Sequence, residues 1–204
     1  MAEFHALVLA AGAGTRFGGR KLLAPWGGGV LLHGALQVAL SAPVAGVVLV
    51  TGADSKEVSE AAQDFAATWT NAPDVHVIHA QDHRDGLSAS LRAGLAALPP
   101  SASGAFIFLG DMLCIPSTVP AALADAMTLP NILAAAPVYE GRRGHPVLVS
   151  AFLFPQLAAL HGDQGARRVL DGLGPALALV PTYDPGVLLD VDETADLARI
   201  LSAR

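Results

Sequence analysis

The sequence predicts a single α/β domain over residues 1–204, built on a mostly parallel β-sheet with helices on both faces. Short apolar runs, typical of strands buried on both faces, alternate along the chain with amphipathic segments long enough for helices. Glycine-rich or acidic loops follow several of these runs. Because parallel sheets bind ligands beyond the carboxyl ends of their strands, the pattern also predicts a ligand site at that edge.

The first expected strand, residues 7–9, is apolar at successive positions and breaks into a loop with glycine at positions 12, 14, 18 and 19. Later strands are expected where short aliphatic runs are bounded by turn residues. After the first, they are residues 46–50, 75–79, 105–109, 132–138, 147–149, 177–180 and 187–189. Segment 147–149 can return beside 132–138 after a turn at 140–144.

Helices are expected between these strands, where apolar residues recur at helical spacing. Asp54 or Ser55 can cap the helix that carries Val58, Ala62 and Phe65 on one face. The expected helices are residues 30–40, a segment that begins at 54 or 55, 87–98, 118–127, 152–160, 165–173 and 193–202.

The composition restricts the classes of function. The chain is 52% hydrophobic and only 15% charged, which is typical of a compact, well-buried globule. Its formal charge of −6 argues against a nucleic-acid partner, and its one cysteine excludes a disulfide framework. The first apolar run is short, broken by glycine and not preceded by basic residues, so neither a signal peptide nor a membrane span is expected. A cytoplasmic location is therefore expected.

The loop after the first strand is expected to bind phosphate. Arg16, Arg20 and Lys21 place three of the twelve basic residues of an acidic chain in this one loop. Glycine lets a backbone approach a ligand closely and lets N–H groups point at an anion. The alternative is a tight turn with solvated arginines.

Two familiar phosphate-binding motifs do not match this loop. A Walker A loop needs a lysine directly after its second glycine and then a hydroxyl residue, but Arg20 stands in the lysine position and no hydroxyl follows. A dinucleotide fingerprint needs a third glycine where Phe17 stands, and an acid about twenty residues later, whereas the next carboxylate is Asp54. A P-loop NTPase is therefore disfavoured, and a nicotinamide-dependent enzyme stays only as an alternative.

Carboxylates follow two apolar runs that are far apart in the chain. Asp111 ends F-I-F-L-G-D, and Asp192 lies in L-L-D-V-D-E-T-A-D-L. Each is either a helix cap or a metal ligand. Asp190 shares a strand face with Asp192, whereas Glu193 and Asp196 are expected to serve the N-terminus of the last helix. Two carboxylates from distant segments suit Mg²⁺ that also binds phosphate oxygens.

A further segment, D-G-L-S-A-S-L-R-A-G-L at residues 85–95, places Ser88 and Ser90 at the start of a helix. Exposed N–H groups at a helix N-terminus can bind an anion or a polar ligand. The alternative is ordinary N-capping by Ser88, with Arg92 on the solvated face.

These motifs together resemble the MobA-like NTP transferase family, whose members transfer nucleotides to sugar phosphates or to the molybdenum cofactor. The likeness covers residues 7–197. In L-A-A-G-x-G-T-R-x-G-x-x-K-L-L the matching residues are Gly12, Gly14, Arg16, Gly18 and Lys21, with Pro25 following. The resemblance implies the Rossmann-like fold of nucleotide-diphospho-sugar transferases and a loop that wraps the triphosphate of an NTP. The nucleotide-binding residues that it implies are Leu9, Ala10, Ala11, Gly12, Gly14, Thr15, Arg16, Lys21, Gly86, Ser88 and Ser90.

The same resemblance assigns the charged residues. G-D-M and D-x-D-T-x-x-D-L look like the family's two metal-binding segments, so Asp111 and Asp192 are expected to bind Mg²⁺. Arg16, Lys21 and Asp111 are the expected catalytic residues. Two departures, Leu113 in place of a frequent proline and Ala195 in place of an acidic residue, remove no ligand but could shift the loops.

Two later segments look like parts of molybdenum cofactor cytidylyltransferases that face the pterin substrate. They are G-R-R-G-H-P-V-L at 141–148 and G-D-Q-G-A-R-R-V-L at 162–170. The expected substrate-binding residues are Arg143, His145, Gly165 and Arg167. The alternatives are a hairpin turn and an ordinary capped helix. Ala10-Ala11-Gly12, where guanylyl-transferring relatives tend to have A-G-G, favours CTP over GTP.

The resemblance therefore implies Mg²⁺-dependent transfer of CMP from CTP to the terminal phosphate of molybdopterin, with release of pyrophosphate. The product would go to an acceptor molybdoenzyme or its chaperone. Two kinds of alternative stay open. One is a guanylyltransferase, or a sugar- or polyol-phosphate nucleotidyltransferase of the same fold. The other is a non-catalytic chaperone that binds a nucleotide or cofactor.

Overall fold

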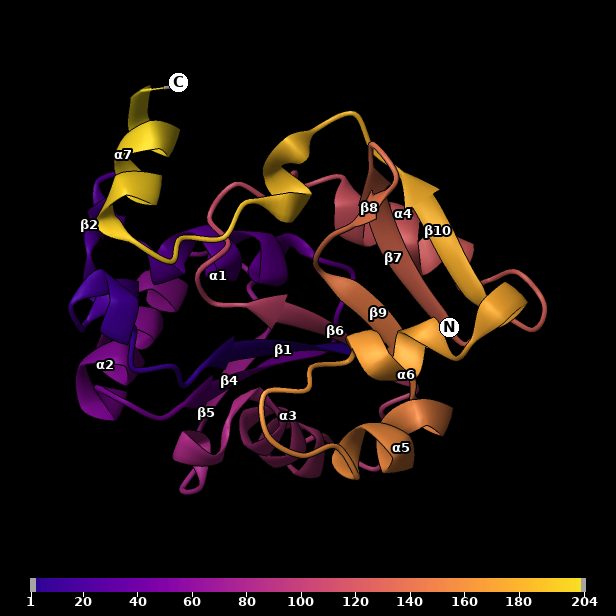
Figure 1. Ribbon diagram of the computed structural model, residues 1–204. Coiled ribbons are helices and arrows are strands. Elements are labelled where there is room, and N and C mark those ends of the chain that lie inside the picture. The colour runs from indigo at the N-terminus through magenta and orange to yellow at the C-terminus, as the bar shows by residue number, and fades with distance from the viewer. Residues whose placement is uncertain (1–2, 203–204) are drawn as a thin grey trace.

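The computed structural model describes residues 3–202 and the side chains of residues 3–200; residues 1–2 and 203–204 of the expected domain lie outside the described part. The strands of the main sheet are β1 (Phe4–Ala10), β4 (Gly46–Thr51), β5 (Asp74–His79), β6 (Gly104–Leu109), β7 (Ala134–Tyr139), β8 (Arg142–Arg143), β9 (Val147–Ser150) and β10 (Leu177–Pro181). Their order is β10-β7-β9-β6-β1-β4-β5, with β8 paired to β7 (Figure 1).

The predicted mostly parallel sheet is confirmed. β1 pairs in parallel with β4 and β6, β4 pairs in parallel with β5, and β10 pairs in parallel with β7. Only β9, among the longer strands, runs antiparallel to its neighbours β6 and β7. Its register beside β7, with Ala135 opposite Leu148, confirms the expected return of segment 147–149.

Alternate residues of the central strands face two separate cores. In β1, Ala6, Val8 and Ala10 face one core, whereas Leu7 and Leu9 face the other. The first core is covered by α1 (Leu32–Ser41), α2 (Ser55–Ala67) and α4 (Val119–Ala126), and the second by α3 (Leu87–Ala96), α5 (Phe154–Ala158) and α6 (Arg167–Asp171). Burial on both faces explains why the strand sequences are unbroken apolar runs.

The N-terminal boundary of α1 differs from the expectation. A two-stranded hairpin, β2 (Pro25–Trp26) and β3 (Gly29–Val30), precedes the helix, so Val30 pairs with Pro25 and is not helical. The turn between these strands uses positive φ at Gly27 and Gly28, a conformation that glycine adopts without steric strain. Two other expected helices are shorter than the sequence pattern indicates. The segment 152–160 forms a 3-10 turn followed by α5, and only α6 is helical within 165–173.

The expected strand at 187–189 is wrong, because this segment belongs to a 3-10 helix at Pro185–Leu188. Pro185 fixes a helical φ and has no N–H to satisfy in the first turn. The Asp184 side chain accepts a hydrogen bond from Gly186 N at 2.7 Å and caps the turn. The turn buries Val187 completely, so the apolar residues that suggested a strand instead reach the core from a helical turn.

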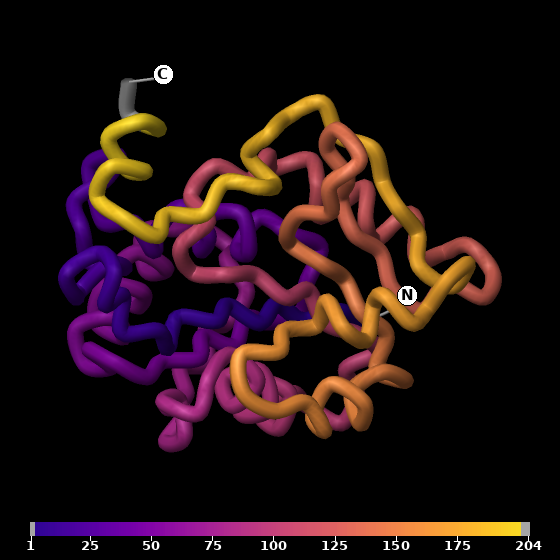
Figure 2. Tube along the Cα trace, viewed as in Figure 1, coloured from indigo at the N-terminus to yellow at the C-terminus, as the bar shows by residue number. Residues whose placement is uncertain are grey.

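The C-terminal part of the chain returns across the molecule to the N-terminal loop. After β10 the backbone passes the carboxyl end of β6, where Val191 N donates to Asp111 O at 3.2 Å, and continues to α7 (Thr194–Ser202), as Figure 2 shows. Residue 192 thereby comes next to residue 16. None of the helices within residues 3–202 is both long enough and apolar enough to cross a membrane.

Candidate active site

The glycine loop folds back so that Lys21 lies against Gly14. Two 3-10 turns, Thr15–Phe17 and Lys21–Leu23, form the loop, and Phe17 N and Gly19 N both donate to Gly14 O. Gly14 has φ +59°, and a Cβ there would lie 2.7 Å from Cβ of Lys21. Only glycine permits this approach together with this backbone conformation. Arg20 instead forms an ion pair with Glu57 of α2 at 3.6 Å.

Lys21 lies between the two carboxylates that were expected to bind metal. Its Nζ donates to Asp111 Oδ2 at 2.6 Å and lies 3.6 Å from Asp192 Oδ1. Arg16 Nη1 donates to Asp192 Oδ2 at 2.5 Å. The Lys21 side chain is only 11% exposed and that of Asp111 22%, so water screens this pair weakly. The structure therefore brings all four expected residues into one cluster, which we call the charge cluster.

Asp190 adds a third carboxylate near the two of the charge cluster. Burial, with the nearby charges of Asp111 and Asp192, raises the pKa of Asp190, and Lys21 only partly opposes this effect. Asp111 Oδ1 is buried and has no hydrogen-bond partner among the described residues. An oxygen in this state favours a further cation close by.

Asp196 holds the backbone that carries Asp192. Its Oδ2 accepts hydrogen bonds from Asp192 N at 3.0 Å and Glu193 N at 2.8 Å. These bonds lower the pKa of Asp196. Asp196 thus serves the N-terminus of α7, as expected, and fixes the loop that presents Asp192 to Arg16.

A cavity of about 750 Å³ lies at the carboxyl edge of β1, β4 and β5. Its lining contains seven of the residues expected from the sequence at this site, namely Leu9, Ala11, Gly12, Thr15, Gly86, Ser90 and Asp111. The other expected nucleotide-binding residues do not line it, namely Ala10, Gly14, Arg16, Lys21 and Ser88. Ala10 is fully buried in the first core, and Ser88 donates from both its N–H and its hydroxyl to Gly162 O, at 3.1 and 2.8 Å.

The cavity also includes residues that sequence reasoning missed. They are Ala13, Gly52, Ala53, His83, Arg84, Leu87, Leu109 and Asp163. Most follow the carboxyl ends of β4 and β5 or lie at the start of α3, so their position at strand ends was the available signal. Asp163 lies in a loop between α5 and α6, within the segment 162–170 that was expected to face the pterin substrate, but it was not among the expected nucleotide-binding residues.

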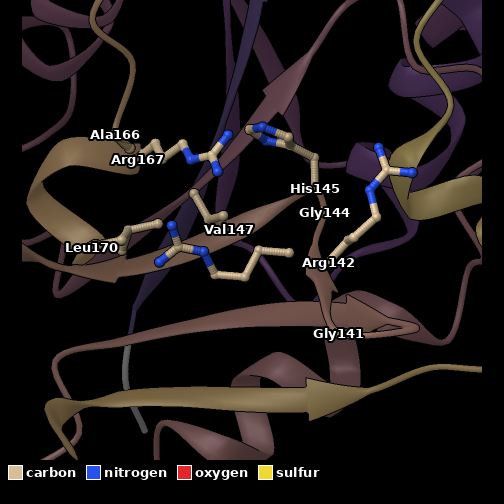
Figure 3. A pocket seen from close by; sticks show the side chains of 9 residues that line it. Gly141, Arg142, Gly144, His145, Val147, Ala166, Arg167 and Leu170 are labelled. Carbon is tan, nitrogen blue, oxygen red and sulfur yellow. The ribbon is translucent and has the colours of Figure 1, made fainter. Parts of the chain in front are cut away.

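A second cavity, of about 350 Å³, is lined by basic side chains. Its lining comprises Gly141, Arg142, Arg143, Gly144, His145, Val147, Ala166, Arg167 and Leu170. The Arg167 side chain extends toward the His145 ring, and the Arg142 guanidinium lies on the opposite side of His145 (Figure 3). Arg143, His145 and Arg167 are thus brought together as expected. Gly165 lies beside them, in a narrow cavity of about 200 Å³.

The cavity of about 200 Å³ lies between the other two. It shares Leu9, Leu87 and Leu109 with the 750 Å³ cavity, and His145, Ala166 and Arg167 with the arginine-lined cavity. The 750 Å³ cavity and the arginine-lined cavity are therefore neighbours on the molecule.

The arginine-lined cavity is positively charged. Arg143 pairs with Asp171, whereas Arg142 and Arg167 form no ion pair with any residue in the described part of the chain. Burial lowers the pKa of His145, which keeps the imidazole neutral near pH 7. The cavity can therefore bind an anion through guanidinium groups and a polar group through a neutral imidazole.

Comparisons with known proteins identify the family of this chain. A family model described as the MobA-like NTP transferase domain matches residues 6–178. Among curated proteins, the chain is 29% identical over 150 residues to the molybdenum cofactor cytidylyltransferase of Escherichia coli, covering 74% of this chain and 71% of that protein. It is also 29% identical over 209 residues to the nicotine blue oxidoreductase of Paenarthrobacter nicotinovorans, covering 96% and 95%.

Solved structures extend the likeness over nearly the whole chain. Rv0371c from Mycobacterium tuberculosis H37Rv superposes with a TM-score of 0.81 at 28% identity, covering 98% of both chains. The same protein in complex with manganese gives a TM-score of 0.78 at 27% identity, covering 100% of both chains.

Proposed function

This chain belongs to the MobA-like NTP transferase family and is a nucleotidyltransferase, and from that premise we propose that it transfers CMP from CTP to the terminal phosphate of molybdopterin, with release of pyrophosphate. The cytidylyltransferase of Escherichia coli, at 29% identity, supports this substrate pair. The sequence Ala10-Ala11-Gly12 in the glycine loop supports CTP over GTP.

One observation carries the proposal: a cavity large enough for a nucleotide lies near a smaller one lined by arginines, with the 200 Å³ cavity between them. The volume of about 750 Å³ lies within the usual range for small-molecule sites. The glycine loop and Asp111 are positioned at this cavity, whereas Arg142, Arg143 and Arg167 surround the second. A reaction between an NTP and an anionic acceptor needs this arrangement, because two negatively charged substrates must meet at one phosphorus.

The charge cluster fits a divalent cation. Asp111 supplies a buried oxygen with no other partner in the described residues, and Asp192 supplies a second carboxylate from a distant segment. Residues 3–200 contain no group of three or more His, Cys, Asp or Glu side chains that could hold a metal ion. Two carboxylates with phosphate oxygens and water are the usual Mg²⁺ ligands. When bound, the ion would neutralise phosphate charge and polarise the phosphoryl oxygens.

The protein's own residues would align the substrates. Lys21 Nζ has three donor protons and uses one in its hydrogen bond to Asp111, so a donor remains for a phosphate oxygen of the leaving pyrophosphate. Arg16 lies beside Lys21 in the same cluster and adds positive charge where the leaving group develops negative charge. Arg142, Arg143 and Arg167 would bind the acceptor, whose phosphate is itself the nucleophile, so proximity and charge neutralisation suffice.

The decisive experiment is a panel of CTP, GTP, ATP and UTP, each with molybdopterin and Mg²⁺, read by pyrophosphate release. We expect release with CTP and molybdopterin, and none when molybdopterin or Mg²⁺ is omitted. A sugar or polyol phosphate in place of molybdopterin is the acceptor control. Preference for GTP or for the control acceptor would replace the proposed substrates. CTP binding without turnover would indicate a chaperone that hands the cofactor to a molybdoenzyme.

A further inference from the structure

Asp163 is a carboxylate in the nucleotide-sized cavity that no described residue neutralises. It lines the cavity together with His83, Arg84, Gly86 and Ser90. Its side chain makes no hydrogen bond and no ion pair with residues 3–200, whereas Asp111, the other carboxylate of the lining, is bonded to Lys21. Asp163 belongs neither to the charge cluster nor to the lining of the arginine-lined cavity.

The backbone beside Asp163 is fixed against the start of α3. Gly162 O accepts hydrogen bonds from Ser88 N at 3.1 Å and from Ser88 Oγ at 2.8 Å. A Cβ on Gly86 would lie 2.5 Å from Gly162 C and O and 2.7 Å from Asp163 Oδ1. The carboxylate therefore faces Gly86 across a contact that only glycine permits, and two hydrogen bonds from a buried serine hold the preceding residue in place.

The position of Asp163 assigns the two ends of the cavity. The triphosphate belongs at the end formed by Gly12 and Thr15, next to Arg16 and Lys21. An unpaired carboxylate repels phosphate, so the part of the lining beside Asp163 and Gly86 suits the nucleoside better than the triphosphate. An ionised carboxylate only accepts hydrogen bonds, so its partner must be a donor. Cytosine offers a 4-amino donor, whereas uracil has a carbonyl oxygen there.

We propose that Asp163 is a specificity residue that accepts a hydrogen bond from the exocyclic amino group of the nucleotide base, and so selects CTP against UTP. This inference rests on the proposed function, because it requires the cavity to take an NTP. It goes beyond that function by assigning base selection to a loop between α5 and α6, far in sequence from the glycine loop and from the start of α3.

The test is Asp163→Asn, an isosteric change at an exposed position. An amide can present either its oxygen to cytosine or its NH₂ to uracil, so discrimination should collapse. We expect the ratio of kcat/KM for CTP to that for UTP to fall about tenfold or more, partly through a gain with UTP. Asp125→Asn, which removes a carboxylate from α4 that is also exposed, is the matched control and should leave the ratio unchanged.

Three results would overturn the assignment. An unchanged ratio, or an equal loss with both nucleotides, would show that Asp163 does not read the base. If the wild-type preference for CTP over dCTP disappears in the variant while the CTP to UTP ratio persists, the carboxylate instead contacts the ribose hydroxyl. A melting temperature equal to that of the wild type establishes that Asp163→Asn is folded.

The test of base selection by Asp163 can succeed or fail independently of the test of the proposed transfer reaction. Dissociation constants for CTP and UTP, measured calorimetrically without acceptor, give the same ratio even if no acceptor is turned over. Failure of pyrophosphate release with intact, Asp163-dependent selectivity in binding would refute the transfer reaction only. Absence of binding by either nucleotide would refute both.

Discussion

Lys21 is the residue on which the charge cluster depends, because it alone contacts both carboxylates. Its ammonium is 2.6 Å from Asp111 and 3.6 Å from Asp192, in a setting with little solvent. An ammonium in this place compensates carboxylate charge in the free protein and can turn to phosphate when a nucleotide binds. Its contribution should therefore be larger in the transition state, when negative charge grows on the leaving group, than in the ground state.

The corresponding prediction is that Lys21→Met lowers kcat by about a hundredfold or more, with a smaller change in KM for CTP. Methionine preserves most of the side-chain volume and removes the charge. Steady-state pyrophosphate release measures both constants. Lys56→Met, at an exposed site on α2, is the control for loss of a lysine. An increase in KM alone would mean that Lys21 binds the substrate and the transition state equally well.

At the level of elements, the loop of residues 162–165 depends on close contact with the start of α3. Gly86 has φ +100° and ψ −176°, a region that is essentially restricted to glycine. A side chain there would also collide with Gly162 and Asp163. The contact joins the nucleotide-sized cavity to the segment that leads into α6 and the arginine-lined cavity.

We therefore expect Gly86→Ala to lower the free energy of unfolding by on the order of 1–3 kcal/mol through backbone strain, and to raise KM for CTP. Gly172→Ala is the matched control, because Gly172 has a negative φ and its nearest neighbour to a new Cβ is 3.5 Å away. Urea denaturation and steady-state kinetics on both variants provide the comparison. Equal stability of the two variants would show that the 162–165 loop adapts without strain.

The elements themselves were predictable where one physical effect dominates. β1, β4 and β6 are buried on both faces, so their apolar runs identify them without ambiguity. The strand expected at residues 187–189 was wrong because an apolar run contains no information about helix capping. The Asp184 cap together with Pro185 favours a helical turn. The β2–β3 hairpin is only two pairs long and leaves no alternating pattern to detect.

The site was predictable to a similar degree. Arg16, Lys21, Asp111 and Asp192 were identified from their motifs, and the structure brings them together. Ser88 was expected to face the ligand, but its role as an anchor for Gly162 depends on a contact between residues 74 positions apart. The place of Asp163 in the nucleotide-sized cavity was not expected for the same reason, although its segment was expected to face the pterin substrate. A sequence pattern reports local periodicity, whereas these roles arise from tertiary contacts.

For the whole molecule, stability should depend on pH through two histidines. Burial lowers the pKa of both His33 and His145 below the ordinary value of 6.5. His33 Nδ1 accepts a hydrogen bond from Val30 N at 3.3 Å, and Nε2 contacts Ala61 O at 3.1 Å, so the neutral ring links β3, α1 and α2. A proton on Nδ1 would remove the acceptor that Val30 N needs.

The direction of the pH dependence follows from the number of protons that the folded and the unfolded chain bind. Below about pH 6.5 the unfolded chain binds protons that the folded chain resists, so the free energy of unfolding should fall as the pH drops from 7.5 to 5.5. Urea titrations across this range measure the loss. His33→Gln should make the dependence shallower, whereas His76→Gln, at an exposed position of β5, should not. A steeper pH dependence of the free energy of unfolding in His33→Gln would contradict the prediction.

The ion pair between Arg16 and Asp192 also bears on how the protein is made. The two residues are 176 positions apart, and the contact between them closes the intervening chain into one loop. Contacts of such long range carry a large loop-closure entropy and are slow to form. A ribosome synthesises the glycine loop well before the carboxylate that completes the charge cluster. A nascent chain thus cannot assemble this site until Asp192, 176 positions after Arg16, has left the ribosome.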